Sequence, residues 1–358
     1  MASAMKLDPK RRGPEAERLY QRLSELVVGQ DEAIREIVDV YQLHSTGLTA
    51  PGRPVGNFLF LGPTGCGKTR LVEATAECLL GDPKAVIKID CAEFQHSHEI
   101  AKLIGSPPGY LGHRETHAML SQESIDRYMT ESVRMSFVLF DEIEKASDAL
   151  WNLLLGILDK ATLTLGDNKK TDFSRTMIFM TGNLGAAEMS AVLQPRMGFQ
   201  AVPVLGPVAA EGVDEEVAGK MSRSATEAAR RKFTPEFLNR LDKIVVFKPL
   251  SKNELRRIVD LELDAIQERI ANTPERAFEF EVTDAAKEFL LAEGTDLRYG
   301  ARHLKRTIDR LVVQPLANLI ASRQVKSGDI VAVDHEAGTP AMTFSKVTER
   351  LVHHAKAA

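Results

Sequence analysis

The sequence has few cysteines, a single tryptophan and no long apolar run. Its 358 residues include three cysteines and one tryptophan. Cys66, Cys78 and Cys91 are odd in number and lack CxxC spacing, which argues against a disulfide framework and against a zinc site. No stretch approaches the roughly 20 apolar residues that span a bilayer, and the N-terminal residues lack the apolar core of a secretory signal. We therefore expect a cytoplasmic protein with no membrane partner.

Neither sign of charge is in large excess. The chain has 46 lysines and arginines against 50 aspartates and glutamates, which gives a net charge of -4. This balance gives no overall electrostatic reason to expect a nucleic-acid partner, although a local basic patch is compatible with it. With 44% hydrophobic and 27% charged residues, the composition is that of a globular protein, and the length suits two domains.

Short apolar runs alternate with segments of helical periodicity over the first 250 residues. The runs lie at 57–62, 85–90, 136–142, 176–183 and 243–247. Helical spacing lies between most of them, for example at 68–80 and 147–160. Strands that alternate with helices predict an α/β fold in which a parallel sheet is the middle of three layers.

A glycine-rich segment after the first of these runs predicts a phosphate site. GPTGCGKT fits G-x-x-x-x-G-K-[ST] between a predicted strand and a predicted helix, and it comprises Gly62, Pro63, Thr64, Gly65, Cys66, Gly67, Lys68 and Thr69. Backbone N–H groups of such a loop cradle phosphates, and the helix N-terminus adds a positive dipole. We expect Lys68 to neutralise the β- and γ-phosphates and Thr69 to ligate Mg²⁺, with ATP and Mg²⁺ as cofactors. A glycine-rich turn with a chance lysine is the alternative.

Two acidic residues end the third apolar run. Asp141 and Glu142 follow FVLF, at the carboxyl edge of the predicted sheet, where open α/β sheets bind ligands. We expect Asp141 to hold Mg²⁺ and Glu142 to polarise the attacking water. A strand with a solvated acidic turn is the structural alternative. Adenylate kinases and other P-loop phosphotransferases share both motifs, but the adjacent glutamate favours hydrolysis over transfer to a metabolite.

Four further segments resemble motifs of the AAA+ ATPases and, among these, of the Clp chaperone family. They are LVVGQDEAI (26–34), TGNLG (181–185), FTPEFLNRLDKIVVF (233–247) and YGARHLKRTIDR (299–310). The resemblance is to the second ATPase module of Clp-type disaggregases and unfoldases, and it runs from about residue 20 to residue 333. Because the motifs occur in the family's order, the set is more specific than any one motif.

The resemblance implies roles for single residues of these segments. Val27 and Val28 match the lining of the adenine pocket, and Asn183 matches the sensor-1 residue that orients the lytic water. Arg240 matches the arginine finger, and Arg302 matches the sensor-2 arginine that reaches the γ-phosphate. The structural alternatives are core packing for the valines, a turn cap for Asn183, and ion pairs or helix capping for the arginines.

The segment LIGSPPGYLGH (103–113) resembles the loop that lines the pore of the family's rings. Its glycines and prolines exclude a helix, and Tyr110 matches the aromatic residue of that loop. The resemblance implies a homo-oligomer, expected to be a hexamer, in which Tyr110 grips a polypeptide client. A tyrosine offers a large apolar area with few rotamers to lose. TLTLGDNKKTD (162–172) stands in the place of a second pore loop, and packing of Tyr110 onto its own domain is the alternative.

The segment PRMGFQ (195–200) resembles a docking loop. Met197, Gly198 and Phe199 match in type and position the tripeptide with which protease-associated Clp unfoldases bind a peptidase ring. Two apolar anchors on a flexible glycine suit apolar clefts, and ring symmetry multiplies weak contacts. A Clp-type peptidase is therefore a conditional partner, and packing of Met197 and Phe199 onto their own domain is the alternative.

Some features depart from the family's pattern. Cys66 stands where the family usually has a small aliphatic residue, and the loop continuation at 113–124 is not the expected short acidic, glycine-containing stretch. The 358 residues contain no large N-terminal substrate domain, no first ATPase module and no coiled-coil insertion, so we expect one ring per hexamer.

We expect four segments along the chain. These are a flexible lead (1–20), an AAA+ large nucleotide-binding domain (21–250), a small, mainly helical C-terminal domain with a short sheet that carries sensor 2 (251–340), and a tail (341–358). Residues 186–222 are rich in Ala, Val, Gly and Pro and break the alternation of strands and helices, which predicts a long excursion.

The function predicted from the sequence is that of an ATP-hydrolysing Clp-type unfoldase that threads polypeptide through a ring pore. A nucleic-acid motor or loader of the same superfamily is the first alternative. Such a motor needs Lys and Arg in its pore loops, whereas the first loop here is aromatic with only His113 and Arg114 nearby, and the net charge of -4 also disfavours it. A nucleotide-binding scaffold without turnover is the second alternative, and Asp141, Glu142 and Arg240 argue against it.

Overall fold

The computed structural model describes residues 8–106, 118–186, 189, 215–273, 277–296, 300–336, 338–339 and 341–347. The chain forms two compact units. The first comprises residues 1–62, 67–192 and 216–248, and the second comprises residues 63–66, 193–215 and 249–358.

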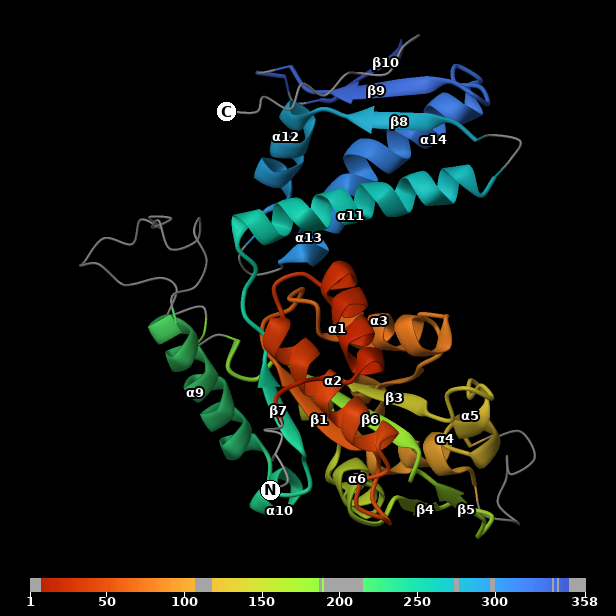
Figure 1. Cartoon of the computed structure of the whole chain (residues 1–358), viewed down its shortest axis with the longest axis vertical. Coiled ribbons are helices and arrows are strands. Elements are labelled where there is room, and N and C mark those ends of the chain that lie inside the picture. Colours follow the sequence, from red (N-terminus) through yellow and green to blue (C-terminus); the bar gives the residue numbers. More distant parts are fainter. Residues whose placement is uncertain are drawn as a thin grey trace, which may run out of the picture. The chain divides into compact units, whose positions relative to one another are not determined.

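The first unit is built on a five-stranded sheet with the order β2-β3-β6-β1-β7, in which every neighbouring pair is parallel (Figure 1). The strands are β1 (Gly56–Leu61), β2 (Ile87–Asp90), β3 (Ser136–Asp141), β6 (Thr176–Gly182) and β7 (Lys243–Val246). β1 and β6 are buried along their whole length, which explains their continuous apolar sequence. Because all five strands run in the same direction, their carboxyl ends meet at one edge of the sheet.

Helices connect these strands. They are α1 (Pro14–Leu26), α2 (Asp31–Ser45), α3 (Lys68–Leu80), α4 (Ala101–Ile104), α5 (Gln122–Asp126), α6 (Asp148–Lys160), α9 (Glu215–Lys232) and α10 (Pro235–Leu238). Short 3₁₀ turns follow β2 and β3, and a hairpin of β4 (Thr162–Thr164) and β5 (Lys170–Asp172) follows α6. This hairpin occupies the segment that resembles a second pore loop.

Phenylalanines fill the centre of the first unit. The ring of Phe179 on β6 lies 5.3 Å from that of Phe58 on β1, and the ring of Phe60 lies 5.0 Å from that of Phe247. All four side chains are fully buried. Aromatic contacts between neighbouring strands stabilise their pairing beyond the burial of area, so the strands that carry the site are held by a rigid core.

The second unit packs helices against a small sheet. Its elements are α11 (Lys252–Ala271), β8 (Glu279–Val282), α12 (Asp284–Gly294), α13 (Ala301–Ile308), α14 (Gln314–Ala321), β9 (Ile330–Asp334) and β10 (Thr343–Val347). The sheet order is β10-β9-β8. α11 begins at a capping box in which Ser251 and Glu254 bond to each other's backbone N–H groups. The core of the second unit contains side chains from its helices and its sheet, among them Leu255, Val259, Leu290, Leu304 and Val331.

The predicted fold class is confirmed, with differences in detail. α9 begins at Glu215, inside the excursion predicted over 186–222, and Met221 and Ala225 lie buried on one face of this helix. Between α13 and α14 the chain forms a π-helical segment at Asp309–Val313. Pro315 follows this segment in α14, and a proline lacks the N–H that would continue a regular helix.

The ends of the chain hold more regular structure than the sequence indicated. α1 begins at Pro14, inside the expected lead, and β10 lies inside the expected tail and pairs with β9. None of the helices that the structure describes combines the length and apolar character of a membrane span.

Candidate functional site

The glycine-rich loop connects β1 to α3. Gly67 is the N-cap of α3 and has φ +100°, and Lys68 is the first residue of that helix. A Cβ added to Gly67 would meet no atom within 4 Å. The backbone conformation, rather than lack of space, therefore requires glycine at this position. The loop thus leads directly into a helix N-terminus, which favours a bound anion.

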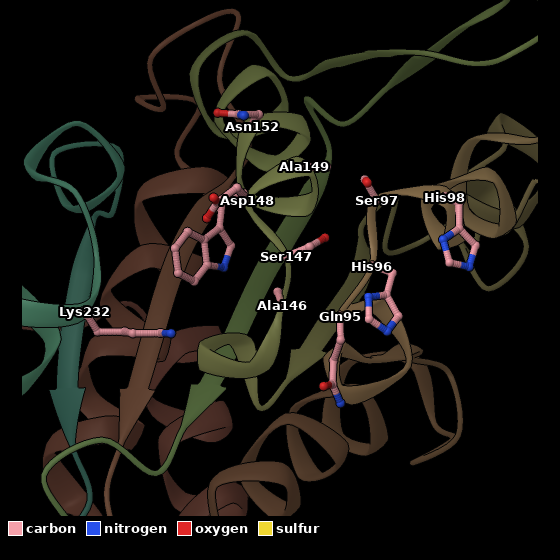
Figure 2. Close-up of a pocket in the computed structure, with 11 residues that line it drawn as sticks. Gln95, His96, Ser97, His98, Ala146, Ser147, Asp148, Ala149, Asn152 and Lys232 are labelled. Atoms are coloured by element: carbon pink, nitrogen blue, oxygen red, sulfur yellow. The ribbon is translucent and has the colours of Figure 1, made fainter.

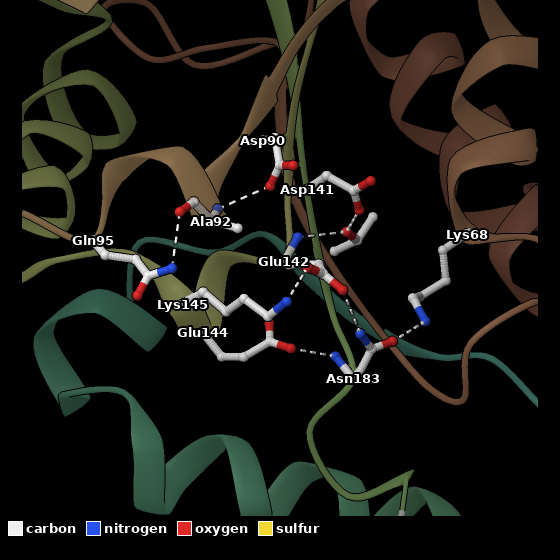
Figure 3. Close-up of polar contacts among 10 residues, drawn as sticks. Lys68, Asp90, Ala92, Gln95, Asp141, Glu142, Glu144, Lys145 and Asn183 are labelled. Atoms are coloured by element: carbon white, nitrogen blue, oxygen red, sulfur yellow. Dashed lines mark hydrogen bonds and ion pairs between the residues drawn. The ribbon is translucent and has the colours of Figure 1, made fainter. Parts of the chain in front are cut away.

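Lys68 is turned back over this loop and is only 8% exposed. Its Nζ donates to the carbonyl oxygen of Gly62 at 2.7 Å and to Oδ1 of Asn183 at 3.0 Å (Figure 3). Asn183 follows β6, the direct neighbour of β1 in the sheet. The sheet order therefore brings together two residues that lie 115 positions apart in the chain.

The acidic pair follows β3, on the other side of β6. Asp141 is the last residue of that strand. Glu142 has φ +56°, a left-handed conformation that is uncommon for a residue with a side chain. Strained backbone of this kind concentrates at functional sites. The Oγ1 of Thr181 on β6 donates to Asp141 Oδ1 and accepts from the Glu142 N–H at 3.1 Å.

The carboxylate of Glu142 has two partners from different elements. Its Oε1 accepts from Asn183 Nδ2 at 3.2 Å, and its Oε2 accepts from Lys145 Nζ at 2.5 Å (Figure 3). The hydrogen bond to Glu142, followed by the charge attraction, raises the pKa of Lys145, so this lysine stays protonated at neutral pH. Lys68, Asn183, Glu142 and Lys145 thus form one continuous polar network.

Sequence reasoning missed Lys145 within this network, and it also missed Thr181 and Glu144, which bond to the backbone of Glu142 and Asn183. Oε1 of Glu144 accepts from the Asn183 N–H at 2.9 Å, and its Oε2 is buried with no hydrogen-bond partner in the described part of the chain. The register that pairs Phe140 with Met180 also sets Asp141 beside Thr181. Thr181 could have been found from that register, which sequence alone does not give.

Carboxylates gather at the ends of β2 and β3. Cys91 is buried behind them, and burial first, then the charges of Asp141 and Asp90, raise the pKa of its thiol. Within the described residues, no three His, Cys, Asp or Glu side chains are arranged to hold a metal ion by themselves. The Asp141 carboxylate and the Thr69 hydroxyl are oxygen donors, and such a pair fits Mg²⁺, which takes one or two protein ligands and completes its shell with phosphates and water.

The remaining residues of the predicted nucleotide pocket lie near the loop or after α1. Thr69 is the second residue of α3, and the Cys66 thiol is buried with its Sγ 3.0 Å from the Pro63 carbonyl oxygen. Val27 and Val28 are buried, at 4% and 5% exposure.

Gln30 stands close to the valine pair in the chain and is itself buried. Its side-chain amide donates to the carbonyl oxygen of Lys248 at 2.9 Å and accepts from the N–H of the same residue at 3.2 Å. This double contact ties the segment after α1 to the segment after β7.

Within the first unit, the described contacts do not join Arg240 to this network. The guanidinium of Arg240 pairs with Asp159 of the same chain, with Nε 3.1 Å from Oδ1. Arg302 is exposed on α13 of the second unit. Tyr110, Met197, Gly198 and Phe199 lie outside the described residues.

A hollow of about 790 Å³ lies at the start of α6, a few residues after the acidic pair in the chain (Figure 2). It is lined by residues of the segment after β2, of the start of α6 and of the end of α9, namely Gln95, His96, Ser97, His98, Ala146, Ser147, Asp148, Ala149, Trp151, Asn152 and Lys232. Trp151 connects it to the network, because its Nε1 donates to the Ile143 carbonyl oxygen at 3.1 Å, between Glu142 and Glu144.

A glycine-rich loop after β1, an acidic pair after β3 and an asparagine after β6 define a P-loop domain with hydrolase-like geometry. The family model for the AAA domain (Cdc48 subfamily) matches residues 53–244, and that for the C-terminal D2-small domain of ClpB protein matches residues 250–333. The first match covers more than half of the chain, and the chain therefore belongs to the AAA family.

Its relatives are Clp proteins. The chaperone protein ClpB of Rhodopirellula baltica is 39% identical over 323 residues, which cover 89% of this chain and 33% of the relative. The ATP-dependent Clp protease ATP-binding subunit ClpC of Staphylococcus saprophyticus is 39% identical over 321 residues, or 89% of this chain and 36% of the relative. This chain thus spans about a third of the length of the curated relatives it matches.

Solved structures agree with these matches. The Saccharomyces cerevisiae Hsp104–casein complex in its extended conformation has 30% identity and a TM-score of 0.76, over 94% of this chain and 53% of that one. A closed-state reconstruction of Hsp104 with ATPγS and FITC casein has 31% identity and a TM-score of 0.74, over 93% and 52%. The resemblance to a Clp-type second module is confirmed.

Proposed function

We propose that this chain is an ATP-hydrolysing remodelling module of the Clp type, which threads polypeptide through the pore of a homo-oligomeric ring, expected to be a hexamer. The observation that carries the proposal is the network that joins Lys68, Asn183, Glu142 and Lys145. It sets a phosphate-binding cation, a polar amide and a carboxylate base at the ends of three adjacent strands, as hydrolysis of a nucleoside triphosphate requires. The family match supports it.

In this proposal the loop and the helix N-terminus of α3 bind the phosphates of ATP. Lys68 exchanges its bond to Asn183 for the β- and γ-phosphates, which frees the amide of Asn183 to orient water. The Thr69 hydroxyl and the Asp141 carboxylate would hold Mg²⁺, which when bound offsets the charge of the phosphates.

Glu142 is the proposed general base. It accepts a proton from the attacking water, for which its carboxylate must be released from Lys145. Glu144 fixes the backbone of Asn183, and Thr181 fixes the backbone of Glu142, so both polar groups keep their place while the phosphates move. Val27 and Val28 would line the adenine pocket, and Arg302 would sense the γ-phosphate.

Arg240 cannot serve the phosphates of its own chain. It precedes β7, at the amino end of the parallel sheet, whereas the glycine-rich loop follows the carboxyl end of β1. The six residues of β1 separate the two ends by about 20 Å. We therefore propose that Arg240 completes the site of a neighbouring copy, which makes a ring necessary for full activity.

Replacement of Tyr110 tests the threading step. Tyr110→Ala is expected to bind and hydrolyse ATP but to lose unfolding of a tagged fluorescent substrate, because the ring would lack its apolar grip. Tyr110→Phe is the matched control and should retain most of the unfolding rate, since it keeps the ring and loses only the hydroxyl. Unfolding by the alanine variant at the wild-type rate would contradict threading by this residue.

The only tryptophan should report nucleotide binding. Trp151 donates to the backbone between Glu142 and Glu144, and its ring lies 5.5 Å from that of Phe233. Rearrangement of Glu142 on binding should change this environment, so ATPγS should give a saturable change in intrinsic fluorescence. Lys68→Ala should give none. Saturable binding measured by equilibrium dialysis without a spectral change would contradict the coupling.

A peptidase partner is a second, narrower proposal. The segment around Met197, Gly198 and Phe199 resembles a docking loop, and one relative is the ATP-binding subunit of a Clp protease. Deletion of residues 196–199 should leave ATP turnover unchanged and abolish degradation coupled to a Clp-type peptidase. Unchanged degradation, with turnover retained, would make these side chains packing residues and the protein a peptidase-independent remodeller.

Two further parts of the proposal concern organisation and location. We propose that the large nucleotide-binding domain ends near residue 250 and that the small domain follows it. We place the protein in the cytoplasm because its three cysteines, all within the described residues, form no disulfide.

A further inference from the structure

The backbone around Arg240 is fastened to the start of β1. Asn57, the second residue of that strand, is fully buried, and its Nδ2 donates to the Arg240 carbonyl oxygen at 3.2 Å. The N–H of Asn57 donates to Asp242 Oδ2 at 2.8 Å, and the N–H of Asp242 donates to the Asn57 carbonyl oxygen at 2.9 Å. Arg53 adds a hydrogen bond to the Arg240 carbonyl at 3.2 Å. The turn that carries Arg240 is therefore attached to the buried strand β1 by several hydrogen bonds.

The same asparagine reaches the end of α6. Its Nδ2 also donates to the carbonyl oxygen of Leu158 at 3.3 Å. The next residue, Asp159, supplies the carboxylate that lies 3.1 Å from Nε of Arg240. One buried amide thus holds the backbone on both sides of the Arg240–Asp159 ion pair, and the pair is positioned by the fold rather than by two free surface side chains.

The contact to Asp159 involves the inner edge of the guanidinium. The Arg240 Nε is buried and makes no hydrogen bond among the described residues, so its contact with Asp159 is an ion pair; the whole side chain is 30% exposed. Nη2 lies 3.8 Å from Oε1 of Glu236, whose side chain is 64% exposed. An exposed pair at that distance contributes little, so the outer nitrogens remain available to an external anion.

We propose that Asp159 is a positioning residue for Arg240: it holds the guanidinium at Nε so that the outer nitrogens are presented to the nucleotide of a neighbouring copy. This inference rests on the proposed function, because it takes Arg240 to act on a second chain. A cation fixed before the reaction needs no reorganisation when charge develops on the transferred phosphoryl group. Asp159 therefore acts through Arg240 and does not touch the nucleotide itself.

The location of Asp159 also relates the two sites of one chain. α6 begins after Ser147, close to Glu142 and Lys145, and its 13 residues span about 20 Å. Asp159 lies in its last turn, beside Arg240. In the first unit, α6 leads from the hydrolysis site of the chain to Arg240, and β1 leads from the Arg240 turn back to the glycine-rich loop.

Steady-state ATPase kinetics of the full chain, with single and double variants, test this inference. Asp159→Asn keeps the shape of the side chain and removes its charge, and we expect kcat to fall about tenfold with KM changed less than about twofold. In the Arg240→Ala background the same replacement should cause no further loss, because the group that it positions is absent. Glu236→Gln is the matched control and should retain wild-type kcat.

The outcomes separate this inference from the proposed function. Arg240→Ala with greatly reduced turnover and Asp159→Asn with unchanged or raised turnover would overturn the positioning role alone. An equal loss from Asp159→Asn in both backgrounds would also overturn it, since the effect would then be on the fold. A wild-type chain without ATPase activity, or an Arg240→Ala variant with full activity, would overturn the proposed function and this inference together.

Discussion

Glu142→Gln is expected to lower ATP turnover at least about 100-fold while ATP binding is retained. Glutamine keeps the shape of the side chain and can still accept from Asn183 through its amide oxygen, but it cannot take a proton from water. The Lys145 ammonium, which pairs with the carboxylate at 2.5 Å, also loses its charged partner. Turnover is measured by phosphate release and binding by equilibrium dialysis with labelled ATP.

Lys68→Ala provides the contrast for this experiment. It removes the cation that the loop holds 2.7 Å from the Gly62 carbonyl oxygen, so binding itself should be lost and turnover with it. Together, the Glu142→Gln and Lys68→Ala variants distinguish a residue that acts as the base from one that binds phosphate. Wild-type turnover by Glu142→Gln would show that another group activates the water, and the assignment of Glu142 would be wrong. Binding without turnover would also make this variant suitable for trapping the polypeptide client.

Arg240→Ala is expected to reduce turnover on the order of 1,000-fold, as loss of an arginine finger does in other P-loop enzymes. The side chain stands at the far end of the sheet from the loop of its own chain, so the loss should fall on the neighbouring site. Binding of ADP should change little, because the finger acts on charge that develops at the γ-phosphate.

Mixing two inactive variants tests whether the site is shared. In randomly mixed rings of Arg240→Ala and Lys68→Ala chains, about one quarter of the sites regain both an intact loop and an intact arginine. Activity should therefore reappear on mixing, and chains that carry both replacements should give none when mixed with Lys68→Ala chains. Full activity of a strictly monomeric wild-type chain would contradict the shared site.

The sheet and the phosphate loop could be predicted because their signals are local. An apolar run followed by GPTGCGKT contains the strand, the loop and the helix start within 24 residues (57–80). The acidic pair could be placed for the same reason. Clp-type motifs in the correct order then indicated the family, which the comparisons confirm.

The partners of these residues could not be predicted in the same way, because they depend on register and on long-range contact. Thr181 meets Asp141 through the β3–β6 pairing, and Asn57 meets Arg240 across 183 positions of the chain. The sequence marks Arg240 only through the family resemblance, and it gives no signal at Asp159. Only the fold sets them beside each other.

Thr181 determines the direction of a short hydrogen-bond chain. Its hydroxyl has a single proton, and since it accepts from the Glu142 N–H, that proton goes to Oδ1 of Asp141. One oxygen of the aspartate is therefore committed as an acceptor, and the lone pairs of the other are left for a cation or its water. Serine would preserve this direction but lose the β-branching that restricts χ1, whereas valine would keep the shape and break the chain at both ends. The Thr181 hydroxyl on β6 thus determines that Oδ2, and not Oδ1, is the oxygen of Asp141 that can bind a cation or its water.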